Sequence, residues 1–250
     1  MQFSANLGFL YQEFPLQQAF HEAARDGFAA VELHWPFAEK PEALLALSQA
    51  LNLPILALNT PMGAKPGDFG LAAVKGREDE FWQGFIMARD FALACHAPCV
   101  HVMAGIAGDE ATFCENLAKA SAEAKGLTLL IEPINHHDRP GYFLHQTAQA
   151  LALIAQLARP NVKLMLDLYH AAKSGENAQQ SLEESLPHLG HVQIASLPDR
   201  HEPDQGSLDY APLFHLLKSA NYTKPIGAEY RPRQDTKSGL DWLRTWRNIS

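Results

Sequence analysis

Short apolar runs alternate with longer amphipathic segments along this chain. The clearest run, Thr128-Leu-Leu-Ile-Glu132, is mostly aliphatic and ends in a carboxylate. A continuous apolar run of this length is typical of a parallel strand that is buried on both faces. The longer segments repeat their apolar residues with the period of a helix. The pattern therefore predicts a chain of strand–helix pairs.

Eight such pairs can be placed along the sequence. The predicted strands cover residues 3–8, 29–34, 54–59, 99–103, 128–132, 162–169, 191–196 and 225–229. The predicted helices cover residues 15–25, 41–51, 77–94, 109–125, 145–158, 177–186, 210–220 and 236–247. Strict alternation over 250 residues predicts an α/β fold, a single (β/α)₈ barrel domain that spans residues 1–250. An open dinucleotide-binding sheet is disfavoured because no glycine-rich phosphate loop follows the first strand.

Four predicted strands carry an oxygen-bearing side chain at or near their C-terminal ends. These residues are Glu132, Asp167, Gln193 and Glu229. In a barrel of this kind the C-terminal ends of the strands carry the chemistry, so the four side chains are expected to converge at one mouth. A carboxylate buried there needs a metal, a cation or a substrate as its partner.

Three carboxylates and one amide oxygen form a set of hard oxygen ligands without a thiolate. Such a set suits Mg²⁺ or Mn²⁺ better than zinc or copper, so Glu132, Asp167, Gln193 and Glu229 are candidate ligands of a divalent metal. A metal bound to a hydroxy-ketone would stabilise the enediolate that forms when the neighbouring carbon loses its proton. Glu132 and Glu229 come from strands on different sides of the mouth and are the candidate catalytic acid and base.

Charge and composition narrow the class of partner. The net charge of −8 and the pI near 5.8 disfavour nucleic acid and anionic membranes, which bind clustered lysine and arginine. The three cysteines lack zinc-ribbon spacing and are expected to be reduced thiols. The first residues do not resemble a secretory leader, and no apolar stretch is long enough to span a membrane, so a soluble cytoplasmic protein is expected. A homo-oligomer is compatible with the sequence.

Other polar residues near the predicted strand ends are candidates for substrate binding. Arg200 could hold a substrate carboxylate bidentately, although an exposed arginine without a role is the alternative. His170 could bond a substrate oxygen or support the metal carboxylates. Asp138 could bind a substrate hydroxyl or cap a loop. Asn59 and His101 end their strands and are expected to line the same pocket, whereas His136 and His137 are expected to be solvated.

Several motifs together resemble the hydroxypyruvate isomerase family of xylose-isomerase-like TIM barrels, and within it most of all the 2-oxo-tetronate isomerases. The similarity runs from Phe3-Ser-Ala-Asn-Leu7 to Gly239-Leu-Asp-Trp-Leu243. The motifs that carry it are Ile131-Glu-Pro-Ile-Asn135, Pro140-Gly-Tyr-Phe-Leu144, Asp167-Leu-Tyr-His170, Gly190-His-Val-Gln-Ile-Ala195, Arg200-His-Glu-Pro-Asp204 and Glu229-Tyr-Arg-Pro-Arg233.

The resemblance implies an isomerase in which Glu132 and Glu229 are the acid/base pair and Glu132, Asp167, Gln193 and Glu229 bind the metal. It implies a small 2-oxo sugar acid as substrate, with 2-oxo-tetronate and 3-oxo-tetronate interconverted. The chain departs from the family in the loop 61–76, where relatives usually carry a Gly-Asp-Trp segment and an Arg-Gly pair, and at Ser207, where a glutamate is common.

Several alternatives stay open at this stage. Hydroxypyruvate conversion to tartronate semialdehyde is the same chemistry on a molecule one carbon shorter, and one such unit is discriminated only about 10–200-fold. A ketose 3-epimerase would move the same proton on a longer, neutral sugar, and a lyase such as an inosose dehydratase would expel a hydroxyl beside the same enolate. A protein that binds a sugar acid without catalysis belongs to a different class altogether.

Overall fold

The computed structural model describes residues 1–247. Eight parallel strands close into a barrel in the order β1-β2-β3-β4-β5-β6-β7-β8, because β1 pairs with β8 as well as with β2. The strands are β1 (Phe3–Asn6), β2 (Ala30–Glu32), β3 (Ile55–Asn59), β4 (Cys99–His101), β5 (Thr128–Ile131), β6 (Val162–Asp167), β7 (Leu189–Ile194) and β8 (Ile226–Ala228). This arrangement confirms the predicted (β/α)₈ barrel.

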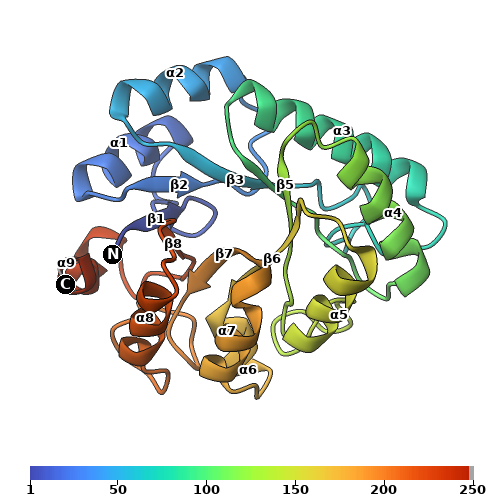
Figure 1. Ribbon diagram of the computed structural model, residues 1–250. Helices are drawn as coiled ribbons and strands as arrows, with labels where there is room; N and C mark the ends of the chain where they lie inside the picture. Colours follow the sequence, from blue (N-terminus) through green and yellow to red (C-terminus); the bar gives the residue numbers. More distant parts are fainter. Residues whose placement is uncertain (248–250) are drawn as a thin grey trace.

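Helices surround the barrel on its outside (Figure 1). They are α1 (Leu16–Asp26), α2 (Pro41–Leu51), α3 (Glu78–Ala94), α4 (Glu110–Ala122), α5 (Thr147–Leu157), α6 (Leu168–Lys173), α7 (Ala178–Ser185), α8 (Tyr210–Ser219) and α9 (Asp241–Arg247), with short 3₁₀ helices at Leu186–His188 and Lys237–Gly239. None of the helices in residues 1–247 combines the length and apolarity that a membrane span requires.

Several helices begin where the sequence supplies a cap. Asp109 accepts a hydrogen bond from the Thr112 main-chain N–H at the start of α4. Asn177 and Asp209 act in the same way at α7 and α8. α1 ends at Gly27, whose φ of 89° is a left-handed conformation that glycine adopts without strain.

Several predicted elements were wrong in their bounds. The strands expected over 3–8, 29–34 and 99–103 end two residues earlier, and the strand expected over 191–196 is Leu189–Ile194. The sixth strand was expected to continue to residue 169, but it ends at Asp167 and α6 follows at once. The last helix was expected over 236–247 and is divided into a 3₁₀ turn and α9. Helix α6 starts without a loop because Asp167 caps it, so no break in the apolar pattern marks the boundary.

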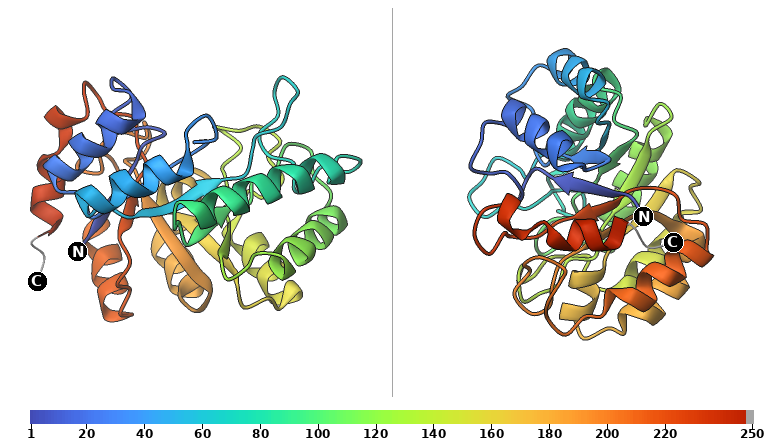
Figure 2. Two further views of the ribbon diagram at one scale, coloured as in Figure 1. Left: turned by 90° about the horizontal axis from the view of Figure 1, so that it is seen from above. Right: turned by 90° about the vertical axis from the view of Figure 1, so that its left-hand side faces the viewer.

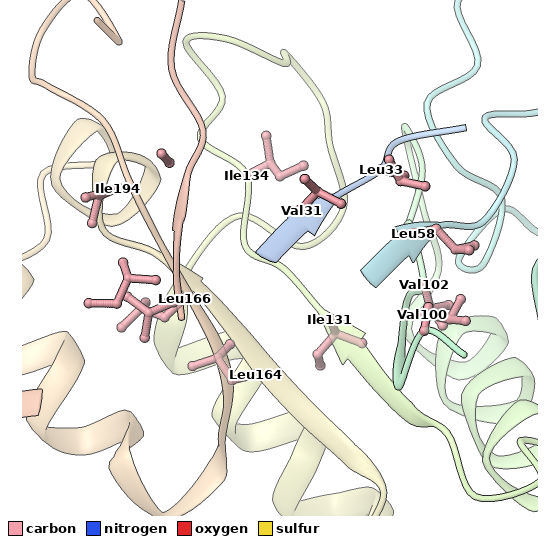
Figure 3. Packing of buried hydrophobic residues seen from close by; sticks show 14 of the residues in the cluster. Val31, Leu33, Leu58, Val100, Val102, Ile131, Ile134, Leu164, Leu166 and Ile194 are labelled. Atoms are coloured by element: carbon pink, nitrogen blue, oxygen red, sulfur yellow. The ribbon is translucent and has the colours of Figure 1, made fainter. Parts of the chain in front are cut away.

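Alternate residues of each strand face opposite sides of the barrel wall. The outward residues, among them Val31, Val100, Leu164, Leu166 and Ile194, pack in the main core between the strands and the helices (Figure 3). The residues between them face inward and include Ala57, Leu130 and Met165, which form a separate small apolar cluster.

The same alternation places the polar candidates. Asp167 lies opposite Gln193 in the β6–β7 register, and Gln193 lies opposite Gly227 in the β7–β8 register. Glu132 and Glu229 directly follow β5 and β8. The candidate side chains therefore share the inner face at the C-terminal end of the barrel. The loop after β3, coloured cyan, extends beyond the barrel at one end (Figure 2).

Candidate active site

A pocket of about 500 Å³ opens at the C-terminal ends of the strands. This volume is within the range of small-molecule sites, about 300–1,000 Å³. The predicted residues that line it are Asn59, His101, Glu132, Asp138, His170, Arg200 and Glu229. Gln193 borders a smaller cavity that Glu132 and Glu229 also line. The structure thus brings the candidate residues from β3 to β8 to one place.

Asp167 has two roles in the local structure. Its Oδ1 accepts a hydrogen bond from the Tyr169 main-chain N–H at 2.8 Å, which caps α6. Its Oδ2 lies 3.6 Å from His170 Nε2 and 3.5 Å from Arg200 Nη2. The cap fixes one oxygen and leaves the other directed at the site.

The buried carboxylates resist ionisation in one another's presence. Burial, together with the charges of Glu229 and Asp167, raises the pKa of Glu132 well above its ordinary value. Burial raises the pKa of Asp167 to about 6 and that of Glu229 to about 8, although Arg200 lowers both. Such pairs of shifted carboxyl groups are found at acid–base sites.

Arg200 is the cation nearest to this group. Its Nη2 donates a hydrogen bond to Glu229 Oε1 at 2.8 Å, and its Nη1 lies 3.8 Å from Asp138 Oδ2. The guanidinium carbon is 4.7 Å from the centre of the Phe9 ring and 5.2 Å from that of Tyr169. The side chain is 11% exposed, so the alternative that Arg200 is an exposed arginine is wrong, and its role in holding substrate stays a prediction.

We expect this carboxylate group to make stability depend on pH. The ordinary pKa values are 3.8 for Asp167 and 4.5 for Glu229, below the values in the folded protein. The folded state therefore holds more protons than the unfolded state in this window, and stability decreases as the pH rises from about 5 to about 8. In protein treated with a chelator the loss should be roughly 2 kcal/mol or more. Thermal unfolding at the two pH values measures this loss of stability. Glu229→Gln should reduce the dependence of stability on pH. An unchanged pH dependence in that variant would contradict a raised pKa of Glu229.

His170 is held by Asn135. Asn135 Oδ1 accepts a hydrogen bond from the Asp138 main-chain N–H at 2.8 Å, so Nδ2 is the atom that faces His170 Nδ1, at 2.5 Å. An amide nitrogen can only donate, so Nδ1 accepts and the proton of the neutral ring lies on Nε2. Burial lowers the pKa of His170 well below its ordinary value, which keeps the ring neutral. His170 therefore presents an N–H donor to the pocket.

The tautomer of His170 can be tested directly. In ¹⁵N-labelled protein, long-range ¹H–¹⁵N correlations should show a protonated Nε2 and an unprotonated Nδ1 from about pH 6 to pH 8. Asn135→Ala should weaken this preference, because the Asn135 main-chain N–H, 3.5 Å from Nδ1, is then the donor that remains. A protonated Nδ1 in the wild type would show that Asn135 is oriented the other way.

The donor set was tested against a divalent metal. Among residues 1–247, ligand atoms of Glu132, Asp167 and His170 lie within 4.8 Å of one another and could hold an ion. The His170 tautomer argues against that imidazole as a ligand, because its pocket-facing nitrogen carries the proton. Glu132 Oε1 and Gln193 Oε1 are buried acceptors without a hydrogen-bond donor in the described part of the chain. Carboxylate and amide oxygens left free in this way fit a hard cation.

Sequence reasoning missed part of the pocket wall. Phe9 and Trp35 line the pocket, as does His34, whose Nε2 is 3.9 Å from Glu229 Oε1. His34 ends the predicted second strand, so the rule that singled out the other strand ends could have found it. Burial lowers the pKa of His34 to about 4, with a further contribution from Arg200. A β-carbon on Gly8 would overlap the His34 ring, so glycine is needed there.

The divergent loop 61–76 also contributes to the wall. Arg77 holds Asp68 through two hydrogen bonds, of 2.5 and 2.8 Å, and this fixes the loop against α3. Phe69 lines the pocket, and the Arg139 guanidinium carbon lies 4.0 Å from the centre of its ring. The loop 61–76 therefore helps to shape the site through Phe69.

Two histidines expected to be solvated are exposed at the loop surface. These are His136 and His137, and His136 stacks on His145 with ring centres 4.0 Å apart. Neither lines the pocket. Asp138 lies in the turn formed with Asn135 and also lines the pocket, so loop capping and substrate binding both remain roles for it.

Comparisons with known proteins place this geometry in a family. The model of the xylose isomerase-like TIM barrel family matches residues 20–246. The 2-oxo-tetronate isomerase of Cupriavidus necator is 39% identical, with 98% of each chain covered. The hydroxypyruvate isomerase of Escherichia coli is 34% identical, with 99% of this chain and all of that protein covered.

A solved structure agrees closely with this barrel. It comes from Brucella melitensis, is described as an AP endonuclease of family 2, and shares 38% identity with a TM-score of 0.94 over 98% of each chain. The sequence and structure comparisons both cover nearly the whole chain. The chain therefore belongs to the xylose isomerase-like TIM barrel family and, within it, to the hydroxypyruvate isomerase family of isomerases.

Proposed function

We propose that this protein interconverts 2-oxo-tetronate and 3-oxo-tetronate, with Glu132 and Glu229 as the acid–base pair. The observation that carries the proposal is the presence of two buried carboxyl groups with raised pKa values in one pocket, in a chain related to isomerases. One carboxylate removes the proton from C3, and the other returns a proton to C2. The proton of the C3 hydroxyl is transferred to the oxygen on C2, so the reaction neither gains nor loses atoms.

The remaining side chains would hold the substrate during this transfer. His170 would donate a hydrogen bond from Nε2 to an oxygen of the substrate. Arg200 would bind the substrate carboxylate and would stay near Glu229. Asp138 would bind a hydroxyl. A divalent metal held by Glu132, Asp167, Gln193 and Glu229 would stabilise negative charge on the two oxygens. Mg²⁺ or Mn²⁺ suits these ligands.

Basic residues at the mouth support an acidic substrate. Arg139, Lys173 and Arg231 line the pocket in a chain of net charge −8. Within residues 1–247 no carboxylate forms an ion pair with Arg139 or Arg231, and the Arg139 guanidinium lies instead over Phe69. Unpaired guanidinium groups favour an anion over a neutral sugar.

Steady-state kinetics with three substrates test this proposal. We expect kcat/KM for 2-oxo-tetronate to exceed that for a neutral ketose by at least about 100-fold, with hydroxypyruvate between them. Arg231→Ala should raise KM for the acids and leave the ketose unaffected. A faster reaction with the ketose than with either acid would favour an epimerase instead.

Nuclease activity is a second candidate, because the Brucella melitensis relative is described as an AP endonuclease. The net charge of −8 argues against binding a polyanion. Incubation with duplex DNA that contains an abasic site separates the two functions. Cleavage that is lost in Glu132→Gln would support the nuclease and contradict the isomerase.

A further inference from the structure

A network of polar side chains from β1, β2 and β7 lies inside the barrel. It consists of Ser4, Glu32, His191 and Gln193, which are all buried. Glu32 is 2% exposed and does not line the substrate pocket. The acid–base chemistry proposed above gives this carboxylate no role, although burying one is costly unless its partners compensate.

Both carboxylate oxygens of Glu32 have partners. Ser4 Oγ donates a hydrogen bond to Glu32 Oε1 at 2.5 Å, and Gln193 Nε2 donates one to Oε2 at 2.8 Å. His191 Nε2 lies 3.1 Å from Oε1. Only the nitrogen of the carboxamide can donate the bond to Oε2, so the amide nitrogen of Gln193 is the atom that faces Glu32.

The orientation of the Gln193 carboxamide follows from this contact. If the amide were reversed, its oxygen would face the Glu32 carboxylate and two acceptors would repel each other. In the observed orientation Oε1 has no donor within residues 1–247. Gln193 lies opposite Asp167 in the sheet and shares its cavity with Glu132 and Glu229.

Strand β8 leaves room for this contact at Gly227. A β-carbon there would lie 2.4 Å from Glu32 Oε1, 2.8 Å from Gln193 Cγ and 2.9 Å from His191 Nε2. These distances are too short for any larger residue unless the network moves. The inner face of the barrel is therefore shaped to let Glu32 and Gln193 meet.

We propose that Glu32 is a positioning residue that holds Gln193 with Nε2 toward itself and Oε1 toward Glu132, Asp167 and Glu229. What this orientation means for metal binding rests on the proposed function, in which the fixed amide oxygen of Gln193 adds a neutral ligand to three carboxylates. A network that only stabilised the fold would contribute to unfolding free energy without affecting the affinity for a metal.

The orientation can be measured without any metal. In wild type labelled with both ¹³C and ¹⁵N, the two Nε2 protons of Gln193, identified by their loss in Gln193→Ala, should exchange slowly with solvent. The nitrogen should also show a coupling across the hydrogen bond to the carboxylate carbon of Glu32. Glu32→Gln should remove the coupling and speed the exchange. This readout uses the wild type as its main sample, so it does not depend on the stability of a variant.

Metal affinity is the second readout. Calorimetric titration with Mn²⁺ should give a dissociation constant roughly 10–100-fold higher for Glu32→Gln than for the wild type. In the Gln193→Ala background the same substitution should have almost no further effect, because the two residues act through one contact. Ser4→Ala is the matched control: it removes another hydrogen bond to Glu32 and should change the affinity by less than about 3-fold.

The outcomes separate this inference from the proposed function. Rapid exchange of the Gln193 amide protons in the wild type, or unchanged Mn²⁺ affinity in Glu32→Gln, overturns the positioning role. If the protons are protected by Glu32 and the wild type binds no Mn²⁺, the positioning role stands and the metal centre of the proposed function fails.

Discussion

Replacing either Glu132 or Glu229 with glutamine is expected to lower kcat for 2-oxo-tetronate by about 10²–10⁴-fold, because an amide cannot take up or release the transferred proton. Both side chains are buried, and both carboxyl groups have raised pKa values. Glutamine has nearly the same shape, so the barrel should remain folded. Initial rates, with circular dichroism as the check on folding, measure the effect.

The two variants should differ in solvent exchange. If each glutamate transfers the proton at a different carbon, one variant should still exchange the substrate proton with solvent although it forms no product. Glu22→Gln on α1 is the control, because that carboxylate is buried but bonds Arg25 and Lys237, away from the pocket. Activity within about 5-fold of the wild type in Glu132→Gln or Glu229→Gln would exclude that residue from proton transfer.

Removing the charge of Arg200 should have the largest effect on stability. Arg200 forms ion pairs with Glu229, Asp167 and Asp138, and its loss leaves buried carboxylates without a counter-charge. For Arg200→Met we expect a loss of roughly 3–5 kcal/mol at about pH 8. The loss should be smaller near pH 5, where Asp167 and Glu229 take up protons. Urea unfolding of chelator-treated protein at both pH values measures it.

Arg89→Met is the matched control for Arg200→Met. Arg89 is 6% exposed and pairs with Asp90 and Glu123 on the outside of the barrel. The carboxylates of these partners are 55% and 56% exposed, so water can solvate them when Arg89 is lost. The decrease in unfolding free energy for Arg89→Met should therefore differ little between the two pH values. An equal pH dependence in the two variants would show that Arg200 does not neutralise the active-site carboxylates.

The barrel and its strand-end carboxylates could be predicted from local sequence. The strand that precedes Glu132 is a nearly pure aliphatic run, and the C-terminal position of Glu132, Asp167 and Glu229 needs only the direction of each strand. Convergence of the side chains then follows from closure of the sheet. These inferences depend on the pattern within one segment at a time.

The contacts between strands could not be obtained in the same way. Glu32 interrupts the apolar run of β2, which is a signal that it needs a partner, but its contacts with Ser4 and Gln193 depend on the register around the barrel. The direction of the Asn135 amide toward His170 depends on a turn with Asp138. Such geometry is set by tertiary packing and leaves no period in the sequence.

Proton NMR in D₂O tests the proposed isomerisation on the substrate itself. Wild-type protein is incubated with 2-oxo-tetronate and, separately, with hydroxypyruvate, each with Mg²⁺ or with a chelator. We expect conversion of 2-oxo-tetronate to 3-oxo-tetronate, with solvent deuterium at the carbon that receives the proton. The double variant that carries both Glu132→Gln and Glu229→Gln should incorporate no deuterium. If the wild type leaves both acids unconverted and without deuterium, the pocket binds a ligand without this chemistry or acts on another substrate, and the proposed isomerisation is wrong.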